Sequence, residues 1–114
     1  MPFSSTGKNT ALDALGVTAM SLHTANPTDT GLVGELAGGS YARKAVTFNA
    51  ASGGSTSMSQ SQVDFDVPGG NTVSHFALWN GSNACIAYGT LSSSEAYGAD
   101  GIYRLTSLTM DLNG

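Results

Sequence analysis

Alternation of apolar and polar residues is the strongest pattern along this chain, and it predicts β-strands. The clearest case is residues 62–67, in which Val63, Phe65 and Val67 alternate with polar residues. Because successive side chains of a strand point to opposite faces, these three apolar side chains share one face. The pattern therefore predicts a strand with one buried face and one solvated face, ended by Pro68 and the glycines after it.

Five further segments have strand-like patterns between turn signals. Residues 72–79 are apolar on both faces, which predicts a central strand covered on both sides. The Asn-Gly pair at residues 80–81 then favours a tight hairpin. The five predicted strands are residues 17–23, 41–48, 72–79, 84–91 and 102–112.

One short helix is predicted before the first of these strands. Asn9 or Thr10 can cap a helix over residues 9–15, and Gly16 stands where a helix commonly ends. The connections between strands are rich in turn-forming residues. The longest of them, residues 24–40, has the length typical of an interaction loop. The predicted connections are residues 24–40, 49–61 and 92–101, of which 49–61 is expected to be mobile.

Together these elements predict an all-β chain that forms one domain over residues 1–114. Six or seven short strands and one brief helix favour an antiparallel β-sandwich or jelly-roll-like domain with one short N-terminal helix. Residues 1–8 have no evident core role and are a candidate for an extended N-terminal arm.

Composition adds that the surface is polar but carries few charges. Only 11% of residues are charged, against about 25% in ordinary soluble domains. Serine, threonine and glycine make up 42 of the 114 residues. An uncharged polar surface loses little solvation free energy when it contacts another protein, so the composition favours a protein that is part of a larger assembly. A stable secreted-type β-domain has a similar composition.

Net charge and hydropathy exclude several classes of partner. The net charge of −4, with no basic run longer than two residues, argues against nucleic-acid binding through phosphate contacts. No apolar run is long enough to span a membrane. The first residues lack the charged and apolar regions of a signal peptide, which predicts synthesis in a cytosol.

Candidate catalytic and metal-binding residues are present but form no recognisable motif. His23 and His75 lack partners at metal-ligand spacing, and the single cysteine, Cys85, lies in an apolar run typical of a buried structural thiol. Asp64 and Asp66 share the solvated face of one strand, which does not provide carboxylates on two sides of a substrate. The sequence thus predicts no catalytic, cofactor-binding or metal-binding residues, and a non-enzymatic protein.

Arg43 and Lys44 are half of the basic residues, and as neighbours on a predicted strand they point to opposite faces. They therefore do not form a basic patch together. For Arg43, the carboxylates within reach of strand pairing or subunit contact are Glu35, Asp64 and Asp66.

Several blocks of the sequence resemble a family of small bacteriophage virion proteins, known from phages of actinobacteria as tail-fibre or head accessory proteins. The resemblance covers nearly the whole chain. Its most specific parts are Tyr-Ala-Arg-Lys-Ala-Val-Thr-Phe at residues 41–48 and His-Phe-Ala-Leu-Trp at residues 75–79. The other blocks are residues 21–27, 38–40, 50–54 and 108–112.

This resemblance implies a virion structural protein without cofactors, located on the capsid surface or in the tail. The favoured role is a capsid decoration protein that docks on the major capsid protein and stabilises the shell. The alternative is a minor tail or tail-fibre component, partnered by tail proteins, that binds glycans of the host surface through Trp79, Tyr88, Tyr97 or Tyr103. A homo-oligomer is expected, with a trimer favoured because icosahedral shells have three-fold positions.

Most residues expected to contact protein partners lie in two segments without an evident core role, residues 1–8 and 27–39. Arg43 is added to them. They are Pro2, Phe3, Lys8, Pro27, Leu32, Val33, Glu35 and Arg43.

Overall fold

The computed structural model describes residues 3–112 and shows a mostly β chain with one short helix, which confirms the predicted all-β class. All strand pairings between the elements are antiparallel. The elements are α1 (Ser5–Ala14), β1 (Val17–His23), β2 (Lys44–Ala45), β3 (Ser55–Ser57), β4 (Val63–Val67), β5 (Asn71–Asn80), β6 (Cys85–Tyr97), β7 (Gly101–Leu105) and β8 (Thr109–Asp111).

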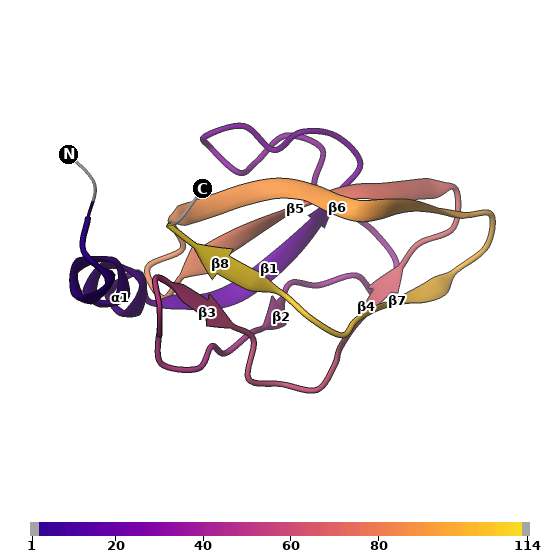
Figure 1. Cartoon of the computed structure of the whole chain (residues 1–114). Coiled ribbons are helices and arrows are strands. Elements are labelled where there is room, and N and C mark those ends of the chain that lie inside the picture. Colours follow the sequence, from indigo (N-terminus) through magenta and orange to yellow (C-terminus); the bar gives the residue numbers. More distant parts are fainter. Residues whose placement is uncertain (1–2, 113–114) are drawn as a thin grey trace.

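The architecture is a four-stranded sheet with two smaller ribbons on one of its faces (Figure 1). The sheet has the strand order β2-β1-β5-β6, and the ribbons are β3-β8 and β4-β7. The apolar core lies between these layers. Met20, Leu22 and Leu78 from the sheet share one buried cluster with Phe65 and Leu105 from the β4-β7 ribbon.

Strand β4 has the alternation that the sequence predicted. Val63, Phe65 and Val67 are buried, while the aspartates between them are partly exposed. Phe65 is opposite Tyr103 of β7, and the two rings meet edge to face with centroids 6.5 Å apart. Its three apolar side chains therefore fix the ribbon to the sheet.

Strand β5 is the centre of the sheet, as its two apolar faces predicted. It pairs with β1 on one side and β6 on the other, and Ala77, Leu78 and Trp79 are buried in succession. Leu78 faces the ribbons, and Trp79 faces the opposite side. That second face is covered by the segment 24–43, which crosses it above the sheet in Figure 1.

The helix begins four residues earlier than predicted, at Ser5. Ser4 caps it, because its hydroxyl accepts the N–H of Gly7 at 3.1 Å. Residues 5–8 are therefore helical, and the extended arm predicted for residues 1–8 is wrong over that part; Met1 and Pro2 lie outside the described residues. Within residues 3–112, no helix is long and apolar enough to cross a membrane.

Residues 49–61, for which a mobile connection was predicted, contain a short strand and hydrogen bonds to the helix. Asn9 and Asp13 of α1 accept the backbone N–H groups of Gly54 and Ala51, at 2.8 and 2.9 Å. Residues Ser55–Ser57 pair with β8. The serine- and glycine-rich composition indicated mobility, but these side-chain and strand contacts satisfy the backbone.

Three strand boundaries also differ from the prediction. The strand predicted over residues 41–48 is reduced to Lys44–Ala45, because Tyr41 and Arg43 turn toward the face of the sheet that the segment 24–43 covers. The strand predicted over residues 102–112 is split at residues 106–108, where the chain passes from one ribbon to the other. Strand β6 continues to Tyr97, through residues predicted as a turn.

Candidate contact surface

The segment 24–43 forms an ordered cap over the second face of the sheet, and its conformation follows from local hydrogen bonds. Asn26 Oδ1 accepts the N–H of Thr28 at 2.9 Å, which forms an Asx turn. Gly31 then donates to the carbonyl of Thr28 at 2.9 Å. Gly31 has a φ of 69°, and a Cβ placed there would lie 2.7 Å from the sulfur of Cys85. Only glycine fits this close approach to the sheet.

A chain of buried hydrogen bonds joins this cap to the sheet below it. The indole N–H of Trp79 donates to Ser21 Oγ at 2.8 Å, and Ser21 Oγ lies 2.7 Å from His23 Nε2. His23 Nδ1 then donates to the carbonyl of Val33 at 2.8 Å. Ser21 and His23 are fully buried. Because a carbonyl can only accept, Nδ1 carries a ring proton, and in the neutral ring Nε2 then accepts from the Ser21 hydroxyl.

The pKa of His23 agrees with this arrangement. Burial lowers it below the ordinary value of 6.5, and the repulsion from Arg43 and His75 acts in the same direction. The hydrogen bond to Val33 and the charge of Glu35 act the other way but do not reverse the shift. Both ring nitrogens of His23 thus have partners within the chain.

Arg43 fastens the other end of the cap. Its guanidinium lies 3.8 Å from the centroid of the Trp79 ring and donates to both carboxylate oxygens of Glu35, at 2.9 and 3.0 Å. A third bond, 2.7 Å long, reaches Asn83 in the turn between β5 and β6. One side chain thus joins the loop, the central strand and a hairpin turn.

Tyr41 completes the same network. Its hydroxyl donates to Glu35 at 2.9 Å and accepts the backbone N–H of Leu22 at 3.1 Å. Burial alone would raise the pKa of Glu35, but the hydrogen bonds from Arg43 and Tyr41 lower it below its usual range. Burial also raises the pKa of Tyr41 strongly. The pair Glu35–Arg43 is therefore ionised and hydrogen-bonded within the chain.

Two apolar side chains remain exposed on this ordered cap. Leu32 is 65% exposed and Val33 is 47% exposed, although the backbone around them is held in place. The N–H of Leu32 donates to Thr30 Oγ1 at 3.3 Å, and the Val33 carbonyl accepts from His23 at 2.8 Å. An exposed apolar pair on a fixed backbone loses little conformational freedom on binding, which is typical of a protein contact.

The structure separates the predicted contact residues into two groups. Pro27 is buried and Glu35 pairs with Arg43, so these three residues shape the cap from within. Leu32 and Val33 are exposed on it. The loop was predicted to lack a core role. This is wrong, because the loop covers the buried side chains of Ser21, His23 and Trp79.

Of the other predicted contact residues, Phe3 and Lys8 belong to the helical end of the molecule, at α1 (Figure 1). Phe3 precedes α1 and is 59% exposed, whereas Lys8 lies on α1 and is partly buried. Pro2 lies outside the described residues. The structure therefore does not bring this group together with Leu32 and Val33.

Sequence reasoning missed the roles of Ser21 and Tyr41 in the cap. A signal was available: Ser21 and His23 are on the same face of one strand, and Trp79 is on another apolar strand. A buried serine, histidine and tryptophan each require a hydrogen-bond partner. What covers them is a long-range contact, which no local pattern could identify.

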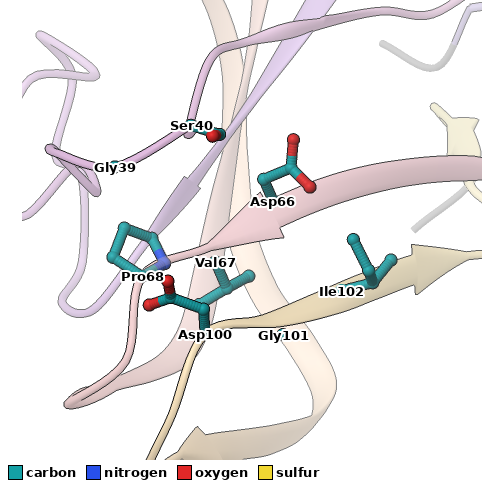
Figure 2. A pocket seen from close by; sticks show the side chains of 8 residues that line it. All are labelled: Gly39, Ser40, Asp66, Val67, Pro68, Asp100, Gly101 and Ile102. Carbon is teal, nitrogen blue, oxygen red and sulfur yellow. The ribbon is translucent and has the colours of Figure 1, made fainter.

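A separate hollow of about 210 Å³ lies where β4 ends, beside residues 39–40 and 100–102 (Figure 2). Asp66 and Asp100 line it, but Asp100 already accepts the N–H of Gly69 at 2.8 Å, and the two carboxylates lie apart. Among residues 3–112, no group of three or more histidine, cysteine, aspartate or glutamate side chains is placed to hold a metal ion.

The aromatic residues predicted to bind glycans do not form a shared platform. Trp79 is covered by Arg43, and Tyr103 packs against Phe65 in the core. Tyr97 is partly buried, and its hydroxyl bonds to the carboxylate of Glu95 and the carbonyl of Ile102. Of these four aromatic residues, only Tyr88 is exposed to solvent, with 42% of its surface accessible.

Comparison with known proteins shows a family match. A family model described as "Podophage GP4 fiber I protein gp80" matches residues 4–113, nearly the whole chain. No curated protein and no solved structure matches.

We expect the pH dependence of stability to report on His23. The unfolded chain binds a proton at His23 as the pH falls through 6.5, whereas the folded protein binds it only at lower pH. The free energy of unfolding is then constant just above this value and decreases below it, by at most about 1.4 kcal/mol per pH unit. The test is read above pH 4.5, because the lowered pKa of Glu35 contributes to the pH dependence at lower pH. Urea denaturation across this range measures the effect. His75→Gln should keep it and His23→Asn should remove it; a flat profile in the unmodified protein would contradict the assignment.

Replacing Arg43 should cost more than its ion pair alone suggests. Arg43→Lys keeps the charge but loses the paired bonds to Glu35 and the stacking on Trp79, so we expect a loss of about 1–3 kcal/mol in the free energy of unfolding. The matched control is Arg104→Lys, because Arg104 pairs with Asp64 at the surface and such pairs add little. Equal losses in the two variants, measured by chemical denaturation, would show that the cap depends on Arg43 no more than on a surface ion pair.

Proposed function

The chain belongs to the family of the podophage GP4 fiber I protein gp80, and on that premise we propose that it is a non-enzymatic structural subunit of a virion fibre. Membership makes it a phage structural protein. The observation that carries the finer proposal is the family match over residues 4–113. In this role the domain acts by contact with neighbouring virion proteins, with no bond made or broken.

The cap described above supports a contact role. Leu32 and Val33 are exposed on a backbone held by His23 and Thr30, and Thr30 to Gly34 carries no charged side chain. Docking such a surface removes few charges from water, so the cost of desolvation is small. The internal pairing of Glu35 with Arg43 has the same consequence, since neither charge needs a partner from outside.

A capsid decoration protein, the role favoured from the sequence, becomes the second candidate. It is favoured by the small size of the molecule, whose extents are 46, 28 and 26 Å. A domain of this size can sit on a shell as readily as along a fibre. The major capsid protein would then be the partner, in place of fibre or tail proteins.

The proposal is tested by counting this chain in purified virions, with heads separated from appendages. We expect a copy number far below that of the major capsid protein and recovery with the fibre-bearing fraction. Quantitative mass spectrometry against the major capsid protein provides the measurement, and antibody labelling in electron micrographs provides the location. A copy number comparable to that of the shell protein, recovered with heads, would favour decoration. Absence from both fractions would contradict any virion role.

A further inference from the structure

The structure has an apolar groove that no part of the described chain fills. It has a volume of about 500 Å³, many times the roughly 30 Å³ of one water molecule in the liquid. Leu15 at the end of α1 borders it, with Ile86 and Tyr88 of β6 and with Met110 and Leu112 at β8. Tyr88 and Leu112 are 42% and 43% exposed.

The groove is open because the layers end there. Strand β6 is the last strand of the four-stranded sheet, and β8 pairs only with β3 in its ribbon. Among the described residues, no strand closes the space between these two free edges. Apolar side chains that would be buried by such a strand are therefore left partly exposed along the groove.

The same molecule carries an apolar projection without a partner. Leu32 and Val33 are exposed together on the cap, and the hydrogen bonds of Thr30 and His23 fix the backbone that presents them. Residues 30–34 are Thr-Gly-Leu-Val-Gly, with no charge. They can approach Asp111 at the edge of the groove without repulsion between like charges.

We propose that Leu32 and Val33 of one copy insert into this groove of a second copy, which joins the chains head to tail. The inference rests on the proposed role of the cap as a contact surface, and it names the partner as a second copy of the chain. A contact between two different surfaces of one chain repeats from copy to copy, so it closes into a ring or continues as a filament. Either result suits a fibre, in which copies of one protein are placed in series.

The contact is small, so its affinity in solution is modest. Two side chains in one groove bury less surface than the roughly 1,200 Å² of a stable complex. Several copies held side by side in a virion would raise the effective concentration and strengthen the contact. In dilute solution we therefore expect association that depends on protein concentration.

Sedimentation velocity of the purified full chain tests the proposal with one projection variant and two groove variants. Leu32→Asp places a charge on the projection. Leu112→Asp charges the edge of the groove, and Thr109→Trp fills it from an exposed position. Each variant alone should associate at least about tenfold more weakly than the unmodified protein. The matched control is Ile102→Asp, which removes an exposed apolar side chain (51%) elsewhere and should change nothing.

Mixing gives the decisive result. Leu32→Asp keeps an intact groove and Thr109→Trp keeps an intact projection, so an equal mixture should form pairs of one chain each and nothing larger. Circular dichroism confirms that each variant is folded, and Leu112→Asp replaces Thr109→Trp if the latter is not.

Three outcomes would overturn the proposal. The first is a protein that stays monomeric up to about 1 mM. The second is association that Leu32→Asp does not weaken, as expected for pairing through β6 edges or for another contact, and the third is a mixture of the two variants that remains monomeric. A monomer would refute this contact without changing the virion copy number, so failure of the proposed function is recognised separately.

Discussion

The packing of the cap, segment 24–43, on the sheet depends on the contacts of the Arg43 guanidinium. It lies on the Trp79 ring and binds Glu35 through two parallel hydrogen bonds, so it joins the central strand to the long loop. A charge held this way is partly removed from water, and the three hydrogen bonds that it donates to Glu35 and Asn83 offset that cost. The chain from Trp79 through Ser21 to His23 provides the second attachment, also with every polar atom paired.

These two attachments explain how a chain with few charges obtains a two-sided sheet. The lower face of the sheet is buried by two ribbons through ordinary apolar packing. The upper face is buried by a loop, which lacks a regular backbone ladder and must satisfy its polar groups individually. Glycine at position 31 permits the closest approach, and the polar network fixes the rest. The loop therefore presents Leu32 and Val33 in a defined position, which is the basis of the proposed contact.

The local parts of this fold could be predicted from sequence, and the long-range parts could not. Alternation identified β4, and two apolar faces identified β5 as the central strand. The residues 41–48 also alternate, yet only two of them pair as a strand, because the bonds of Tyr41 and Arg43 to Glu35 override the pattern. The helix start was missed because Ser4 caps as well as Asn9, and Asn9 is used instead to hold Gly54.

The same distinction applies to the contact residues. Loop length and composition placed Leu32 and Val33 in an interaction element, and the structure finds both exposed. Glu35, Arg43 and Pro27 were placed in the same group because the sequence left Glu35, Asp64 and Asp66 as alternative partners of Arg43 and did not reveal the burial of Pro27. Their actual role is to hold the surface on which the other two lie.

Amide hydrogen exchange of the loop is the most direct test of the claim that the cap is a fixed part of the fold. The N–H groups of Thr24, Gly31 and Leu36 donate to the carbonyls of Gly34, Thr28 and Leu22. We predict that these three amides are protected to within about tenfold of the amides that pair β1 with β5. Exchange at the rate of an unfolded chain, with the sheet still protected, would show that the loop opens independently and would contradict the account.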